Sequence, residues 1–350
     1  MPANLAFCLL ENNMEINTQL TKKSAQLGND ITAIQGAGGN TSIKSGDALF
    51  IKASGMWLRD ATTKSIFVEV SRRAALDLLK EGNDSFAGLI AGRLRPSVET
   101  PLHALMPHAV VVHAHCVHTI ARSVMPNAQK ELHQRLSGIR WQLLPYARPG
   151  LPLAYTVRDA LATSPADVLI LQNHGIVVGG DSVGDAFARL DEVRRRLAVP
   201  PRSAGTADTN ALECRNDRGW TIPHDPAWHG LATVAENFAA ACAGPFYPDH
   251  VVFLGGITPV MRDGESLSRA LERFRNAAGA EPVYMLCEGK GMLVSPQLTP
   301  GAAAMIDALA LVAPRLSLSR PLSALNGDDI AALLNWDAEK YRQALAKAGE

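Results

Sequence analysis

The stretch Val110-Val-Val-His-Ala-His115 decides how the rest of the chain is best interpreted. Its three β-branched valines predict a strand, and side chains in a strand alternate between its two faces. His113 and His115 therefore project from one face, while Ala114 points to the other. Two imidazoles side by side on a stiff strand supply half of a tetrahedral metal site. The same spacing also fits a strand with two solvent-facing histidines, and this stretch alone leaves both interpretations open.

Composition excludes several classes of function. The chain has 350 residues, of which 47% are hydrophobic and 19% are charged, enough for one large or two ordinary domains. The formal net charge is zero, so no bulk field would attract nucleic acid or an anionic membrane. No apolar stretch approaches the roughly 20 residues that are needed to span a bilayer. We therefore expect a small-molecule partner, with neither nucleic acid nor membrane involved.

The cysteines and the first residues indicate the compartment. The five cysteines are scattered singly without a CxxC pair, which is typical of reduced thiols. The N-terminal apolar run is brief and has no basic residues before it, which does not fit a signal peptide. We expect a cytoplasmic protein.

Two small-residue segments upstream of the histidines suit an anion. Gln35-Gly-Ala-Gly-Gly-Asn-Thr-Ser-Ile-Lys44 offers bare amides, but it is not a dinucleotide fingerprint, because Thr41 stands where GxGxxG needs its last glycine. A tight hairpin turn would also explain it. A strand over residues 47–52 then leads into a second small-residue turn, whose Ser54 and Gly55 could lie beside Asn40. Lys52 could add a positive charge there, although a lysine near a strand end is more often only solvated.

A carboxylate precedes the histidine strand. The segment from Arg95 to Met106 predicts a short helix that starts near Pro96 and Ser97. Glu99 would then lie in the first turn, where the helix N-terminus stabilises a carboxylate. Alternatively, Glu99 faces the metal and acts as an acid/base whose pKa is set by the cation and by burial.

A third histidine follows a second strand. A buried strand over residues 167–172 ends at Asn173-His-Gly175, and residues 176–180 form a return strand. A histidine beside a glycine in a strand-to-strand turn suits a third ligand, although His174 could equally bond only to nearby backbone. Three histidines would give Zn²⁺ three nitrogens and leave one position open, which is typical of a catalytic site.

These groups together suit one kind of chemistry. A divalent cation can bind an α-hydroxyketone by its two oxygens, a carboxylate such as Glu99 can remove the adjacent C–H proton, and the metal then holds the enediolate. Making or breaking the C–C bond needs one more proton donor for the aldehyde oxygen. A phenol such as Tyr146, on an expected exposed Pro-rich loop over residues 142–150, could supply it.

A linker that begins at Val199 separates two expected domains, residues 1–200 and 211–350. In the second we expect strands over residues 249–254 and 282–286, with residues 289–294 as a hairpin partner. Helices are expected over residues 231–242, 300–311 and 328–346. We see no catalytic cluster in this part of the sequence, so we assign it to packing, lid or assembly work.

Six short motifs, in this order, resemble the class II aldolase/adducin family, which includes fuculose- and rhamnulose-phosphate aldolases and ribulose-phosphate 4-epimerases. They are Gly38-Gly-Asn-Thr-Ser42, Ala53-Ser-Gly55, Pro96-Ser-Val-Glu99, Val112-His-Ala-His115, Pro145-Tyr-Ala147 and Asn173-His-Gly175, and they cover about residues 15–200. The resemblance implies an α/β fold: a three-layer α/β/α domain with a mixed, largely antiparallel sheet. The expected strands and helices beyond the linker add a smaller α+β C-terminal unit. The resemblance also implies a homo-oligomer such as a tetramer.

The resemblance implies roles for individual residues. They are His113, His115 and His174 for the metal, Glu99 as acid/base and resting-state fourth ligand, and Asn40, Ser54, Gly55 and Ser97 for the substrate phosphate. Tyr146 aligns with a tyrosine that reaches a neighbouring subunit's site in fuculose-type aldolases. Two features depart from that pattern: Val98 replaces a second serine, and the segment between His115 and Tyr146 is longer than in the short members.

The strongest likeness is to the aldolase portion of bifunctional rhamnulose-phosphate aldolase/dehydrogenase proteins. It extends to Tyr247-Pro-Asp-His-Val-Val-Phe253 and Asn335-Trp-Asp-Ala-Glu-Lys-Tyr341, and the chain ends where their dehydrogenase portion would begin. We expect a metal-dependent aldolase, a lyase that cleaves or forms a C–C bond in a sugar phosphate. The expected cofactor is Zn²⁺, or another divalent cation such as Mn²⁺ or Co²⁺.

Two alternatives stay open. The same site could serve a 3-oxo acid phosphate decarboxylase or a pentulose-phosphate 4-epimerase, so the substrate could be a phosphorylated sugar or a sugar acid. A non-catalytic, adducin-like assembly domain is an alternative of another class. Adducin-type domains can lack the metal histidines, whereas all three histidines and Glu99 are present here, which argues against that alternative.

Overall fold

The computed structural model describes residues 18–84, 89 and 94–336. The chain divides into two compact units. The first comprises the residues up to Cys116 together with His133–Leu197, and the second comprises Val117–Leu132 together with the residues from Ala198 onward. Val117–Leu132 thus packs with the second unit although it precedes residue 200 in the sequence. The two domain ranges expected from the sequence stay a prediction.

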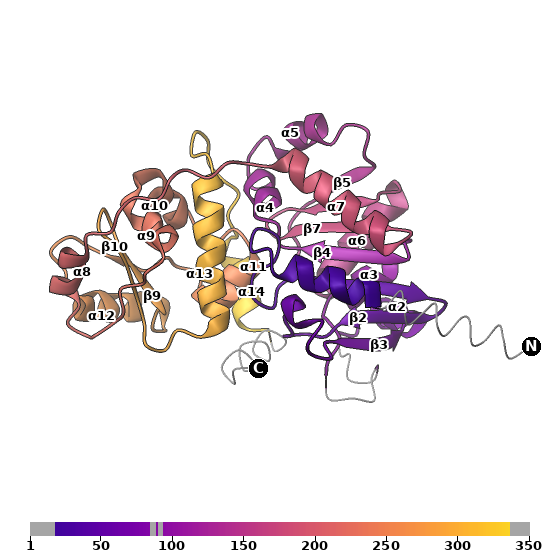
Figure 1. Cartoon of the computed structure of the whole chain (residues 1–350), viewed down its shortest axis with the longest axis horizontal. Helices are drawn as coiled ribbons and strands as arrows, with labels where there is room; N and C mark the ends of the chain where they lie inside the picture. Colours follow the sequence, from indigo (N-terminus) through magenta and orange to yellow (C-terminus); the bar gives the residue numbers. More distant parts are fainter. Residues whose placement is uncertain (1–17, 85–88, 90–93, 337–350) are drawn as a thin grey trace, which may run out of the picture. The chain divides into compact units, whose positions relative to one another are not determined.

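A seven-stranded sheet forms the centre of the first unit (Figure 1). Its strands are β1 (Asn40–Ser45), β2 (Ala48–Lys52), β3 (Phe67–Ser71), β4 (Val110–Ala114), β5 (Trp141–Leu144), β6 (Val168–Leu171) and β7 (Gly175–Gly180). The order across the sheet is β3-β2-β1-β4-β7-β6-β5. Only the β5–β6 pair is parallel, so the sheet is mixed and largely antiparallel, as predicted.

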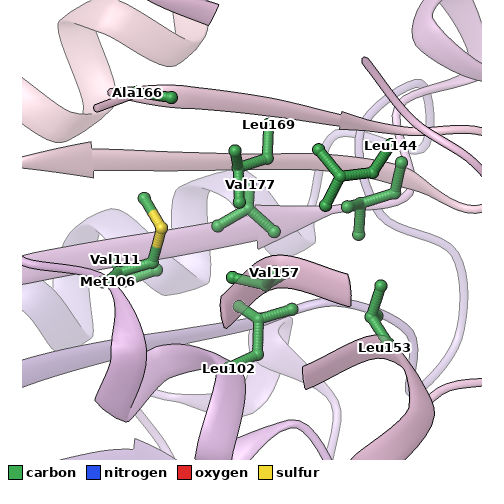
Figure 2. Close-up of a cluster of buried hydrophobic side chains, with 10 residues drawn as sticks. Leu102, Met106, Val111, Leu144, Leu153, Val157, Ala166, Leu169 and Val177 are labelled. Atoms are coloured by element: carbon green, nitrogen blue, oxygen red, sulfur yellow. The ribbon is translucent and has the colours of Figure 1, made fainter. Parts of the chain in front are cut away.

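Helices pack on one face of this sheet and form an apolar core with it. The helices α2 (Arg72–Glu81), α3 (Thr100–Leu105) and α6 (Leu151–Thr163) contact one another on this side. Leu102 of α3 and Val157 of α6 pack against Val111, Leu169 and Val177 of the central strands (Figure 2). These side chains are buried, so the hydrophobic effect, which is non-directional, holds α3 and α6 against the sheet.

Other helices cover the second face. Helix α7 (Val183–Leu197) packs on β4 and β7, and its buried residues recur every three or four positions, as expected for an amphipathic helix. A helix over residues 18–28 contacts β1 through a buried 2.7 Å hydrogen bond between the Ser24 and Thr41 hydroxyls. The predicted three-layer α/β/α architecture is therefore confirmed.

Two local expectations in the first unit are wrong. Residues 142–150 do not form an exposed loop throughout, because Trp141–Leu144 is the edge strand β5 and Tyr146 is half-buried. The prolines of this segment suggest a loop, but the strand ends just before the first of them. Helix α3 starts at Thr100 and not near Pro96, because Pro96 bridges Ala53 in extended conformation.

The second unit contains a three-stranded sheet of order β10-β9-β8 with helices around it. Its elements are α4 (Val117–Ser123), α8 (Thr209–Arg215), α9 (Pro226–Thr233), α10 (Ala235–Cys242), α11 (Pro248–Leu254), β8 (Val260–Met261), α12 (Leu267–Ala278), β9 (Tyr284–Cys287), β10 (Gly291–Val294), α13 (Pro300–Val312) and α14 (Gly327–Leu334). Helix α5 (Ala128–Arg135) crosses the division between the units. The β9–β10 hairpin and the α+β character are as predicted.

The prediction of a strand over residues 249–254 is wrong, because this segment belongs to helix α11. Nearly every residue of α11 is buried, and a short apolar run of this kind has no periodicity to separate helix from strand. The helix expected over residues 231–242 is broken in two at Val234. Most of the helix expected over residues 328–346 lies outside the described residues. Among the helices that the structure describes, none is both long and apolar enough to cross a bilayer.

Candidate metal centre

Strand pairing brings three histidines together in the first unit. His113 lies on β4 and His115 closely follows it, whereas His174 lies in the turn between β6 and β7. Because β4 and β7 pair antiparallel, with Ala114 opposite Ile176, the end of β4 lies beside the start of β7. The three imidazole centroids are 4.8–5.0 Å apart, so the rings form a nearly equilateral triangle.

The turn that carries His174 requires backbone conformations and close contacts that few residue types tolerate. Asn173 adopts a φ of 57°, the left-handed region that asparagine tolerates better than most residues. A Cβ on Gly175 would lie 2.3 Å from the carbonyl oxygen of Ala114. Only glycine therefore permits the start of β7 to approach β4 closely enough for His174 to meet His113 and His115.

We expect Gly175→Ala to separate β7 from β4 and to disrupt the histidine triangle. The overlap with Ala114 should cost about 1–3 kcal/mol of unfolding free energy and weaken metal binding. Denaturant unfolding and a metal titration measure the two effects. Gly184→Ala on α7 is the matched control, since its Cβ would meet only Ser182 at an ordinary 3.7 Å. Equal behaviour of the two variants would contradict the close-approach explanation.

Glu99 completes the cluster. Its Oε2 lies 3.4 Å from His113 Nε2, and its Oε1 lies 3.5 Å from His174 Nε2. Asn40 donates a 2.7 Å hydrogen bond from Nδ2 to Oε2. Glu99 is the N-cap residue of α3, so it lies just before the first turn and directs its carboxylate to the histidines.

Opposing effects set the ionisation of Glu99. Burial acts to raise the pKa of this carboxyl, but the positive potential of His113, His174 and His115 and the hydrogen bond from Asn40 act in the other direction and lower its pKa to about 2. Glu99 is therefore an anion at neutral pH, which is the form that can balance a cation or accept a proton.

These residues fit a divalent cation. One nitrogen from each histidine lies within 4.8 Å of the others, and the Nε2 atoms of His113 and His115 are 3.1 Å apart. Nitrogens at about 2.0–2.1 Å from a tetrahedral zinc ion would be separated by roughly 3.4 Å. The Nδ1 of His113 is 3.0 Å from the carbonyl oxygen of Ile176, a bond that favours the tautomer in which Nδ1 carries the proton and Nε2 can act as a metal ligand. Three imidazoles, which bind a metal ion through a deprotonated ring nitrogen, and one carboxylate form a donor set that suits zinc, manganese or cobalt.

Three small-residue segments converge beside Glu99. Ser97 Oγ accepts hydrogen bonds from Asn40 Nδ2 at 3.1 Å and from the Glu99 amide at 3.2 Å. The amide of Ser54 donates to the carbonyl of Arg95 at 2.8 Å, which joins the second segment to the third. The structure therefore brings Asn40, Ser54 and Ser97 into one region from three separate parts of the chain.

Lys52 joins the first two of these segments. Its side chain is only 2% exposed, and Nζ donates to the carbonyl of Ala37 at 2.8 Å and to that of Met56 at 2.6 Å. The alternative of a lysine that is only solvated is therefore wrong. Gly55, with a φ of 78°, lies in the turn that Lys52 holds at Met56.

Tyr146 is the residue that the sequence predicted as the proton donor for the aldehyde oxygen. Tyr146 follows β5, the edge strand that is separated from β7 by β6, and it is half-buried.

His103 was not among the predicted site residues, yet it is fully buried four residues after Glu99. Burial lowers the pKa of His103 to about 3, although the charge of Glu99 acts to raise it. The spacing of four on a predicted helix was the signal that could have found it.

The fold is that of an α/β protein of the class II aldolase type, and its three-histidine cluster could hold a metal ion. Residues 24–199 match the class II aldolase and adducin N-terminal domain, and the chain belongs to this family. Members of the family are usually lyases and typically use a divalent metal ion.

One protein similar to this chain is named an oxidoreductase, whereas solved structures similar to it are named as aldolase proteins. An uncharacterized oxidoreductase, YuxG, from Bacillus subtilis strain 168 is 28% identical over 184 residues, or 47% of this chain. The match covers only 26% of YuxG, so the chain corresponds to about a quarter of that protein. The class II aldolase domain of a conserved Thermoplasma acidophilum protein is 25% identical over 51% of this chain and 90% of its own, with a TM-score of 0.46. An L-fuculose-1-phosphate aldolase from Thermus thermophilus is 18% identical over 51% of this chain and 92% of its own, with a TM-score of 0.37.

Proposed function

We propose that this protein is a metal-dependent sugar-phosphate aldolase that cleaves a ketose 1-phosphate into dihydroxyacetone phosphate and an aldehyde. The observation that carries the proposal is the buried triangle of His113, His115 and His174 with the Glu99 carboxylate 3.4–3.5 Å from two of them. Such a site combines a place for a Lewis acid with an anionic base, the two elements that proton removal next to a carbonyl requires.

The three histidines would hold Zn²⁺, or Mn²⁺ or Co²⁺. When bound, the cation supplies Lewis-acid polarisation of the substrate carbonyl and hydroxyl oxygens. Glu99, ionised at neutral pH, accepts the C–H proton next to the carbonyl in the synthetic direction and returns it in the cleavage direction. Asn40 holds Oε2, while Oε1 lies 3.5 Å from His174 Nε2. Tyr146 is proposed to exchange the proton of the aldehyde oxygen, in a neighbouring subunit's site of a homo-oligomer such as a tetramer.

The converging segments are proposed to bind the substrate phosphate. Asn40, Ser54 and Ser97 supply polar side chains, and Gly55 supplies a backbone amide. Lys52 keeps its ammonium group behind two of these segments, where it orders them and adds a positive charge. A phosphate bound there gains both hydrogen bonds and electrostatic attraction.

We expect Lys52→Met to weaken both the fold and substrate binding. The methionine fills a similar volume but leaves the Ala37 and Met56 carbonyls without this donor, at a cost of about 1–3 kcal/mol in unfolding free energy. The KM for a phosphorylated substrate should rise. Denaturant unfolding and steady-state kinetics test this, with Lys80→Met on the exposed face of α2 as control. An unchanged KM in a folded protein would remove Lys52 from the phosphate site.

Decarboxylation of a 3-oxo acid phosphate and 4-epimerisation of a pentulose phosphate are proposals for the same residues, because both also need a polarised carbonyl. The particular likeness to bifunctional rhamnulose-phosphate aldolase/dehydrogenase proteins and a cytoplasmic location likewise stay predictions. An adducin-like assembly role would not need three buried histidines and an anionic glutamate around one point, so we rank it below the enzymatic proposals.

The test is a substrate screen on metal-loaded protein. Purified protein is titrated with Zn²⁺, Mn²⁺ and Co²⁺, and then assayed with a panel of ketose 1-phosphates, pentulose phosphates and 3-oxo acid phosphates. We expect one metal ion per chain and release of dihydroxyacetone phosphate from a ketose 1-phosphate. Metal binding with turnover only of another substrate class would replace the aldolase proposal by one of its alternatives. Folded protein that binds no metal would favour the assembly role.

A further inference from the structure

Helix α3 is too short to fix its own position, yet the proposed acid/base lies at its start. The helix has six residues, and Glu99 is its N-cap residue. Isolated helices of this length are not stable in water. Contacts between α3 and the sheet must therefore determine where the Glu99 carboxylate lies.

Strand β1 contacts this segment through alternate side chains on one face. Asn40 Nδ2 donates to Glu99 Oε2 at 2.7 Å, and Ser42 Oγ is 2.7 Å from His103 Nδ1. Two residues along a strand advance by about 6.7 Å, and four residues along a helix advance by about 6 Å. The two spacings nearly match, so both hydrogen bonds form side by side between the strand and the helix.

A third contact lies beyond the end of α3. Lys44, the next β1 residue on the same face, donates from Nζ to the carbonyls of Met106 and, at 2.8 Å, of His108. Polar contacts thus run along the whole length of α3, from Glu99 through His103 to the segment that leads into β4. The Ser42–His103 bond is the middle one.

Both residues of the Ser42–His103 bond are completely buried. Among the described residues, no hydrogen-bond partner for His103 Nε2 is found. A buried nitrogen without a partner costs about 1–3 kcal/mol, a cost that a leucine of similar size would avoid. The presence of a histidine at this position is therefore explained by its other nitrogen, Nδ1, which is hydrogen-bonded to Ser42.

We propose that Ser42 and His103 are a positioning pair that fixes α3 on β1 and thereby holds the Glu99 carboxylate beside His113 and His174. Neither residue is assigned a contact with the metal or the substrate, since both act through Glu99. The proposal rests on the proposed function, in which Glu99 moves the substrate proton.

The test compares two buried side-chain hydrogen bonds that β1 forms on its opposite faces. Ser42→Ala removes the positioning bond, whereas Ser24→Ala removes the equally buried 2.7 Å bond to Thr41 on the other face of β1. Hydrogen–deuterium exchange of the α3 amides is measured first, because it needs neither substrate nor metal. We expect faster exchange in α3 for Ser42→Ala only, with similar losses of thermal stability in both variants.

Turnover is then measured on the metal-loaded proteins. For Ser42→Ala we expect kcat to fall by roughly 10- to 100-fold with little change in KM or metal content, because Glu99 is displaced and not removed. Ser24→Ala should keep its kcat. His103→Leu should behave like Ser42→Ala, whereas His103→Asn, whose amide can take the place of Nδ1, should recover part of the turnover.

Two results would overturn the positioning role: unchanged α3 exchange in Ser42→Ala, or the same loss of kcat in Ser24→Ala as in Ser42→Ala. Failure of the proposed function looks different, because the wild-type protein would then turn over no substrate. The exchange experiment would still decide in that case whether the pair anchors α3.

Discussion

Glu99→Gln is expected to keep its metal ion and to lose nearly all turnover. The amide has the same shape and can still accept the hydrogen bond from Asn40, but it cannot take a proton from carbon. General acid–base catalysis typically contributes about 10²- to 10⁴-fold, and we expect kcat to fall by that range. The three imidazoles stay in place, so metal content should remain near one ion per chain.

The measurement pairs kcat with metal analysis on the same preparation. Glu69→Gln is the matched control, because Glu69 is an exposed glutamate on β3 of the same unit. An unaffected rate in Glu99→Gln would remove Glu99 from the mechanism. Loss of the metal together with the activity would instead assign Glu99 chiefly to the coordination of the ion.

His115→Ala is expected to abolish both metal binding and activity. It removes one of three nitrogens and leaves His113 and His174, which a buried divalent cation cannot use alone without other donors. Turnover should fall to background. Added Zn²⁺ should raise the Tm of the wild-type protein, since a ligand that binds only the folded state stabilises it, but should not raise the Tm of the variant.

The control for this variant is His133→Ala, which removes an exposed histidine from α5. Metal analysis and a thermal titration of both variants separate a specific loss from a general effect on folding. Full metal occupancy in His115→Ala would show that the ligand set is wrong, and the enzymatic proposal would have to be rebuilt on other residues.

Much of the fold was predictable because the local sequence pattern favours the same secondary structure that the tertiary packing requires. The β-branched run before His113 forms a strand, and the buried strand expected over residues 167–172 forms β6. Prediction failed where local pattern carries little information. Residues 249–254 are mostly buried, so helix and strand look alike in sequence, and the strand Trp141–Leu144 lies next to prolines that suggest a loop.

The sequence by itself determined which residues could form a metal site, because histidine spacing on a strand and a glycine beside His174 are local properties. The tertiary structure alone decided that the three imidazoles meet. The antiparallel pairing of β4 with β7 joins residues about 60 positions apart, a long-range choice that no local pattern encodes. It also decided the role of His103, because only the packing of α3 on β1 places a buried serine against that ring.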